Sequence, residues 1–213
     1  MELVTKRNII SLIFAFTCLL LFFFFPVDDF KFEIFVALII FLFVLPVMYT
    51  KIILHENYDK LGFGSIKIDV KTVFFIITSI VLGGLVAFGI VTFEIGVQPY
   101  LMSLSEAILT HFGAFAIYEI FFASLTLFLF TFFAWGFVYS IKLKKEIYTY
   151  IIAELVFIVL LVSFYHSTWI IIPMLIPTLF VPQIRDKKNI IYLFSAIFVI
   201  ALIIDTLIIK LYS

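Results

Sequence analysis

The stretch 107–141, AILTHFGAFAIYEIFFASLTLFLFTFFAWGFVYSI, decides how this chain folds. Only His111 and Glu119 in it are charged or readily titratable. A membrane-spanning helix needs about 20 residues, because each residue adds about 1.5 Å of rise across a hydrocarbon core of about 30 Å. The stretch can therefore hold one span beside a shallow helix, or nearly two spans. The two possibilities place every later loop on opposite sides of the membrane.

The composition of the whole chain places it in a lipid bilayer. Hydrophobic residues make up 65% of it, charged residues only 13%, and the mean hydropathy is +1.30. A soluble domain carries about 25% charged residues, so this chain is predicted to be an integral membrane protein. Its fourteen basic residues are balanced by fourteen acidic ones, and no nucleic-acid partner is implied.

Seven segments are predicted to span the membrane, which gives an all-α bundle in a single domain, 1–213. The predicted spans are 9–27, 32–50, 73–93, 118–141, 147–165, 169–181 and 190–209. The sixth is short and carries Pro173, Pro177 and Pro182, and each proline removes a backbone donor, so a kinked or broken helix is expected there. The third contains Gly83, Gly84 and Gly89, which predict a face on which a neighbouring helix packs closely.

The basic residues decide between one span and two in the stretch 107–141. Twelve of the fourteen form four clusters between apolar segments: Lys6 and Arg7; Lys51, Lys60, Lys67 and Lys71; Lys142, Lys144 and Lys145; Arg185, Lys187 and Lys188. One span puts all four clusters on one side, which the positive-inside rule makes cytoplasmic. We therefore predict an external helix, amphipathic or re-entrant, at 98–117. The N-terminus is then cytoplasmic and the C-terminus external, in the plasma membrane.

Acidic residues inside spans are the first candidates for function, because each costs about 2.5 kcal/mol or more at the bilayer centre. Glu154 lies about 10 Å along the fifth span, so it must face protein or be protonated. A structural role for Glu154, as a paired or hydrogen-bonded carboxyl, and a functional role are equally compatible with the sequence. Glu119 and Asp205 are expected nearer the outer interface, where a structural role is the simpler interpretation.

Two histidines, His111 and His166, are predicted to lie on the outer side, together with Glu119, Glu94 and Glu106. Imidazoles and carboxylates that converge there could hold a metal ion or relay protons. Their spacings match no metal-binding motif, however, and the sequence contains no HExxH. We therefore expect no metal and no cofactor.

Four short motifs, spread over most of the chain, occur in an order that is known from one protein family. They are Leu61-Gly62-Phe63-Gly64 before the glycine-containing third span, Trp135-Gly136-Phe137-Val138-Tyr139, Val162-Ser163-Phe164-Tyr165-His166, and the turn 185–189 before the last span. In this order they resemble the Leu-Gly-Leu-Arg, Arg-Gly-Phe-Leu-Tyr, Phe-x-x-x-His and Arg-Thr-Gly stretches of the CAAX protease and bacteriocin-processing family of intramembrane proteases.

The resemblance implies a catalytic motif, Glu-Glu-x-x-x-Arg, that this chain lacks. In that family its glutamate activates water, and histidines of later helices stabilise the oxyanion. The two glutamates fall at Phe130 and Thr131, and the arginine at Trp135. His166 matches the second motif, whereas the third, His-x-x-x-Asn, falls near Ser195 and has no counterpart. The resemblance therefore suggests a degenerate member without that family's catalysis.

Three functions follow as hypotheses. The leading one is a non-catalytic scaffold or subunit that binds another membrane protein, because a family-like layout has lost its catalytic carboxylates. The alternative is a small transporter or channel subunit that uses Glu154, Asp205 and the proline-broken sixth helix. The third is an active intramembrane hydrolase with an atypical site at His166.

Overall fold

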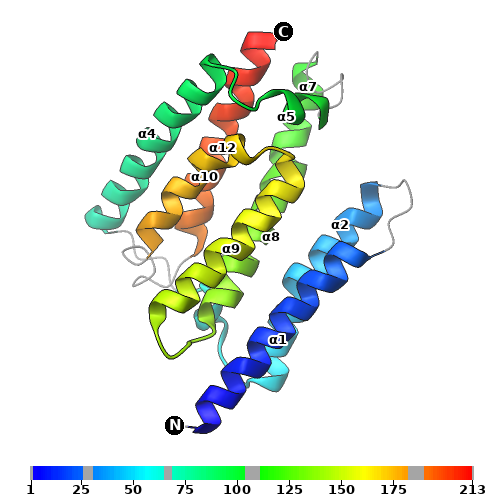
Figure 1. The fold of residues 1–213 in the computed structure, drawn as a ribbon, viewed down its shortest axis with the longest axis vertical. Helices are drawn as coiled ribbons and strands as arrows, with labels where there is room; N and C mark the ends of the chain where they lie inside the picture. Colours follow the sequence, from blue (N-terminus) through cyan, green and yellow to red (C-terminus); the bar gives the residue numbers. More distant parts are fainter. Residues whose placement is uncertain (1, 26–30, 65–68, 104–110, 182–189, 213) are drawn as a thin grey trace.

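A computed structural model describes residues 2–25, 31–64, 69–103, 111–181 and 190–212 of the chain. This described part consists of helices joined by short connections, and no β-strand occurs in it (Figure 1). The prediction of an all-α protein is confirmed.

Six helices of the described residues are long and apolar enough to cross a membrane. They are Lys6–Phe24, Glu33–Ile53, Val70–Thr92, Phe112–Ser140, Glu146–Tyr165 and Ile190–Leu211. The remaining predicted span corresponds to a shorter apolar helix, Thr168–Phe180. The chain therefore has the make-up of a multi-pass helical membrane protein.

Two of these long helices, the second and the fourth along the chain, change between α- and π-helical winding along their length. The first long helix is α1 (Glu2–Phe24), and the second joins α2 (Lys31–Ile39), the π-helical η1 (Ile40–Val44), α3 (Leu45–Met48) and the π-helical η2 (Tyr49–Ile53). The fourth joins α7 (Phe112–Ile117), the π-helical η4 (Tyr118–Ala123), α8 (Ser124–Thr131), the π-helical η5 (Phe132–Phe137) and the 3-10 turn η6 (Val138–Ser140). π-helical turns are rare and are often found at functional sites.

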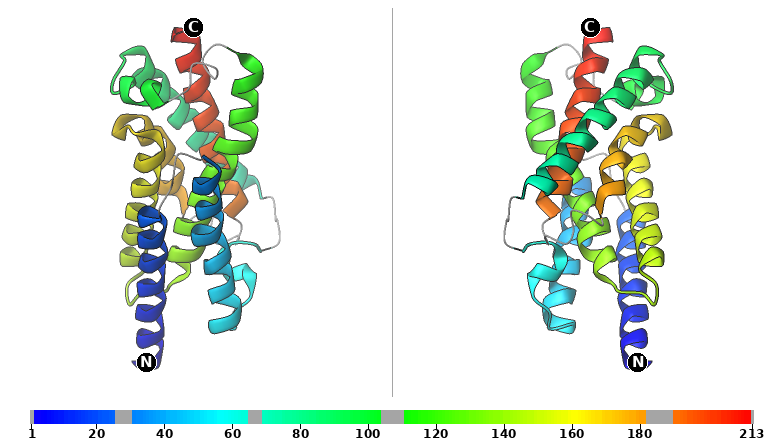
Figure 2. Two further views of the ribbon diagram at one scale, coloured as in Figure 1. Left: turned by 90° about the vertical axis from the view of Figure 1, so that its right-hand side faces the viewer. Right: turned by 90° about the vertical axis from the view of Figure 1, so that its left-hand side faces the viewer.

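The other helices complete the bundle. They are the 3-10 turn η3 (Tyr58–Leu61), α4 (Val70–Thr92), α5 (Gln98–Ser103), α9 (Glu146–Tyr165), α10 (Thr168–Leu175), the 3-10 turn η7 (Ile176–Phe180) and α12 (Ile190–Tyr212). α4 packs along α12 and α10, and α12 also packs on α8 (Figures 1 and 2). α9 and α12 both run towards the end of the molecule that holds the C-terminus, so α10 and η7 return the chain between them (Figure 1).

The short sixth helix is broken at Pro173 and Pro177, as expected, while Pro182 lies outside the described residues. α10 contains Pro173 and ends at Leu175, where the 3-10 turn η7 begins with Pro177 in its first turn. The missing N–H of Pro177 leaves the carbonyl of Pro173 without its helical donor, and the cap N–H of Ile176 binds that carbonyl instead. This tighter turn replaces the lost α-helical hydrogen bond.

Gly83 of α4 is a point of close contact between helices. A Cβ atom at this position would lie 2.4 Å from Cδ1 of the buried Ile200 and 3.1 Å from the carbonyl oxygen of Pro173. Gly89, two turns further along α4, has nothing within 4 Å of such an atom. The predicted glycine packing face is therefore confirmed at Gly83, where α4 meets both α12 and α10.

The loop after the second helix folds back onto the bundle. Gly62 adopts a left-handed conformation, with φ of 88°, and its carbonyl accepts a hydrogen bond of 2.9 Å from the N–H of Ile190 at the start of α12. The neighbouring Leu61 is fully buried, and its carbonyl lies so close to Gly136 of η5 that a side chain there would clash. Gly62 and Leu61 thus connect this loop to α12 and to η5.

Only parts of the predicted external helix 98–117 lie within the described residues. α5 forms its beginning, and 104–110 fall outside the description. Residues 112–117 form α7, which continues without interruption into η4. The fourth long helix thus begins at Phe112 and not at 118, because no proline or charged residue stops it there.

We expect Gly83→Leu to destabilise the protein, because its side chain would have to displace Ile200 and the backbone of α10. Overpacking of this kind costs about 1–3 kcal/mol. The measurement is the thermal unfolding midpoint in detergent. Gly89→Leu is the matched control on the same helix and should leave the midpoint unchanged or raise it slightly. Equal midpoints for the two variants would contradict the packing described here.

Candidate functional site

Two acidic side chains, Glu119 and Asp205, are buried in the interior of the bundle. Each is only 2% exposed. Glu119 lies in η4, and Asp205 lies in α12. Glu119 is therefore not at the start of its span, as the predicted bounds 118–141 implied. The fourth helix begins six residues before Tyr118, and α12 continues to Tyr212, so neither carboxyl is at a helix end.

The carboxyl groups of Glu119 and Asp205 lie next to each other and interact directly. The hydroxyl of Tyr100, from α5, donates a hydrogen bond of 2.5 Å to Oδ1 of Asp205. Both oxygens of Glu119 and Oδ2 of Asp205 are buried, and no described donor outside the carboxyl pair itself reaches them. The two carboxyls thus hydrogen-bond to each other, which requires a proton on one of them, and among the described residues Tyr100 is the further donor to the pair.

Three tyrosines surround this pair. Tyr100 and Tyr165 are almost completely buried, and their ring centroids are 5.2 Å apart. The hydroxyl of Tyr165 has no hydrogen-bond partner among the described residues, and Tyr118 interacts with Tyr100 and with both carboxyls. We call this set of five residues the dicarboxyl site. It joins α5, η4, α9 and α12, which are far apart in the sequence.

Tyr100 acts as a hydrogen-bond donor in this site. Burial, and then the nearby carboxylate of Asp205, raise the pKa of the Tyr100 phenol well above its ordinary value. The phenol therefore keeps its proton at neutral pH and can stabilise negative charge on Asp205. Sequence reasoning missed this residue, because one tyrosine among ten gives no signal of its position.

The dicarboxyl site can bind a proton or a hard cation. Two carboxylates side by side in a medium of low dielectric repel each other strongly, and none of the described lysine, arginine or histidine side chains interacts with either group. A proton or a bound cation can supply the missing positive charge. The phenol groups can donate or accept hydrogen bonds, so they can interact with the carboxyls whether a proton or a cation is bound there. The described residues contain no group of three or more His, Cys, Asp or Glu side chains that could hold a metal ion.

Glu154 belongs to a separate polar site, at the break between α10 and η7. Its Oε1 accepts a hydrogen bond of 3.0 Å from the hydroxyl of Thr178 in η7, and its Oε2 is buried without a partner. Tyr150, one turn earlier on α9, donates to the carbonyl of Thr178 at 3.2 Å. Glu154 is partly exposed, so it is less buried than Glu119 and Asp205. Burial within the bundle therefore favours Glu119 and Asp205 over Glu154 as the interior acids.

The structure does not bring the predicted histidines to Glu119. His111 is exposed at the start of α7, and His166 is exposed at the end of α9, where it has a left-handed backbone with φ of 53°. Glu94 is exposed in a connection, and Glu106 lies outside the described residues. Both histidines are exposed at helix ends, whereas Glu119 is buried in the core.

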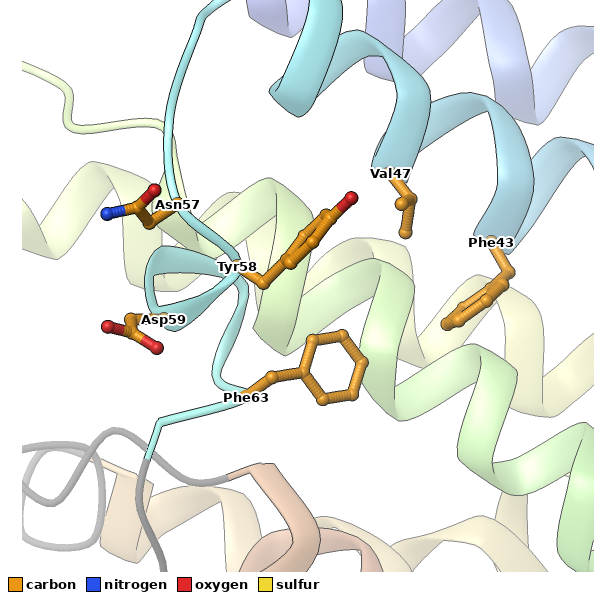
Figure 3. A pocket seen from close by; sticks show the side chains of 6 residues that line it. All are labelled: Phe43, Val47, Asn57, Tyr58, Asp59 and Phe63. Atoms are coloured by element: carbon orange, nitrogen blue, oxygen red, sulfur yellow. The ribbon is translucent and has the colours of Figure 1, made fainter.

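A groove of about 540 Å³ lies beside the second helix, apart from both acidic sites. Figure 3 shows the rings of Tyr58 and Phe63 directed towards Phe43 and Val47, while Asn57 and Asp59 point the other way. The ammonium of Lys51 lies 5.3 Å from the centre of the Tyr58 ring. This groove holds no cluster of buried titratable groups, so the dicarboxyl site is the stronger functional candidate.

No family model, no curated protein and no solved structure matches this chain.

Tyr100→Phe should destabilise the protein by about 1–3 kcal/mol, because it leaves Oδ1 of Asp205 buried without its donor. The thermal midpoint in detergent measures the loss. Tyr148→Phe removes the hydroxyl of an exposed tyrosine and serves as the control. If both variants unfold at the wild-type temperature, the hydrogen bond from Tyr100 does not stabilise the buried pair.

Proposed function

We propose that this chain is a small membrane transport protein, or the subunit of one, that carries protons or a cation through the dicarboxyl site. The observation that carries the proposal is the pair Glu119 and Asp205, buried side by side without a basic partner among the described residues. Ionisable groups inside membrane segments are costly and usually mark ion pathways or proton relays. A purely structural role would be served better by apolar residues of similar volume.

The broken helix supports the same proposal. α10 packs on α4, α9 and α12, and α12 carries Asp205. In many transporters a discontinuous helix lies at the binding site and moves against the rest of the bundle. Pro173 and Pro177 give this chain such a helix directly beside two helices of the dicarboxyl site.

The proposed topology has seven passes, with the N-terminus in the cytoplasm and the C-terminus outside the plasma membrane. The parallel course of α9 and α12 supports it, since α10 and η7 must then bring the chain back (Figure 1). Lys71 in the first turn of α4 and Lys145 just before α9 then lie on the cytoplasmic side. An outer interfacial position of α5, the described beginning of the predicted external helix, is part of this proposal, and the dicarboxyl site lies in the outer half.

Purified protein in liposomes tests the transport function. With a pH-sensitive dye inside and a potassium diffusion potential, the wild type should admit protons faster than protein-free vesicles. Asp205→Asn and Glu119→Gln should reduce this flux at least tenfold, because each removes an ionisable group of the site. Glu146→Gln changes an exposed carboxyl on α9 and should have wild-type flux. An inactive wild type, over a range of added cations, would refute the proposal, as would full flux through Asp205→Asn.

A non-catalytic scaffold related to the CAAX-type proteases, binding a membrane protein partner, is the second candidate. At the positions that the resemblance assigns to the catalytic motif, Phe130, Thr131 and Trp135 are all buried in the bundle. The hydroxyl of Thr131 is bonded to the carbonyl of Leu127 at 2.7 Å. This observation favours a packing role at those positions. A partner that copurifies at constant stoichiometry, with no flux in liposomes, would support the scaffold over the transporter.

A further inference from the structure

We propose that Glu154 is the anionic centre of a second binding site, which takes a lipophilic organic cation from the bilayer. The site consists of Glu154 and Tyr150 on α9, Thr178 in η7 and Trp135 in η5. The inference names the substrate class of the proposed transport function, and it rests on that function.

The carboxyl of Glu154 lacks both a counter-charge and a full set of hydrogen bonds. The hydroxyl of Thr178 lies 3.0 Å from its Oε1 but only 2.6 Å from the carbonyl of Leu175. One hydroxyl carries one hydrogen, so these two acceptors compete for it. Oε2 has no partner, and no ion pair reaches Glu154 within the described part of the chain. A positively charged ligand would supply the counter-charge that Glu154 lacks and could bind to its Oε2.

Tyr150 interacts with this carboxyl, and Trp135 packs against Tyr150. Tyr150 lies one helical turn before Glu154 and is held in place by its hydrogen bond to Thr178. The ring of Trp135 packs against Tyr150 with centroids 5.3 Å apart, and its buried indole N–H has no acceptor among the described residues. A carboxylate with a tyrosine beside it and a tryptophan behind that tyrosine suits an organic ammonium or related cation, which aromatic rings also attract. A small metal ion would instead require several oxygen ligands.

The position of Glu154 allows such a ligand to enter from the lipid. Ile151 and Leu155, which flank it on α9, are 46% and 57% exposed, and Leu179 of η7 is 63% exposed. Side chains of this kind on a membrane helix face the acyl chains. Glu154 therefore lies at the border between the lipid-facing surface and the core, and a cation dissolved in the bilayer can reach it laterally.

The second site is distinct from the dicarboxyl site. Glu154 and Tyr165 lie on nearly the same face of α9, eleven residues and therefore about 16 Å apart. Ile158 and the buried Leu161 occupy that face between them. A proton at one site and an organic cation at the other can thus be bound separately, while α9 and the adjoining broken helix connect them.

Equilibrium binding of radiolabelled tetraphenylphosphonium to the purified protein in detergent tests this site. We expect saturable binding to the wild type, an affinity at least tenfold lower for Glu154→Gln, and three- to tenfold lower for Trp135→Leu. Glu154→Asp keeps the charge and should retain most of the affinity. Glu146→Gln, on the same helix, is the control and should bind as the wild type does.

The pH dependence of binding provides an independent readout. Tyr150 is the titratable group that interacts with Glu154 among the described residues, and it stays neutral near pH 7. Protons should therefore compete with tetraphenylphosphonium at Glu154 alone, so wild-type binding should weaken as the pH falls. Glu154→Gln should lose this dependence. A wild type whose binding is indifferent to pH would overturn the assignment.

The outcomes separate this inference from the transport function. No saturable binding to a wild type that is monodisperse by size exclusion, or wild-type affinity in Glu154→Gln, overturns the cation site whatever the flux. Glu154-dependent binding in a protein without flux supports the site and refutes transport. Asp205→Asn should lose proton flux while it keeps tetraphenylphosphonium binding, and loss of both would overturn the separation of the two sites.

Discussion

The close approach of α4 to α12 and α10 at Gly83 is the contact on which the rest of the bundle depends. Lipid tails are as apolar as leucine side chains, so helices in a bilayer gain stability from close packing more than from leaving the solvent. A position without a side chain lets Ile200 and the carbonyl of Pro173 come into contact with α4. That packing holds α12 in place, and with it the carboxyl of Asp205.

Two polar sites result, and both combine helices that are distant in the sequence. Asp205 of α12 meets Glu119 of η4, with Tyr100 and Tyr165 from two further elements around them. Glu154 of α9 meets Thr178 at the break after α10. In each case a buried carboxyl oxygen has no hydrogen-bond partner outside the site among the residues that the structure describes. Such groups cost stability, and their retention is the reason to assign them to binding and transport.

The sequence alone predicted much of the fold and some of the site. Its apolar segments predicted the long helices, its prolines predicted the break after Leu175, and its glycines predicted the contact at Gly83. It also singled out Glu119, Glu154 and Asp205 as candidates. It placed Glu119 at the start of the fourth span, however, because nothing in a uniformly apolar run shows that the helix begins already at Phe112.

By itself, the sequence determined that this is a multi-pass helical membrane protein, because a chain so apolar must satisfy its backbone hydrogen bonds within helices. Local patterns of apolar residues, proline and glycine contain that information. Only the tertiary structure decided which polar groups meet. The pairing of Glu119 with Asp205, the approach of Tyr100, and the exposure of His111 and His166 depend on how helices rotate and pack against each other. Contacts between residues a hundred positions apart leave no trace in local sequence.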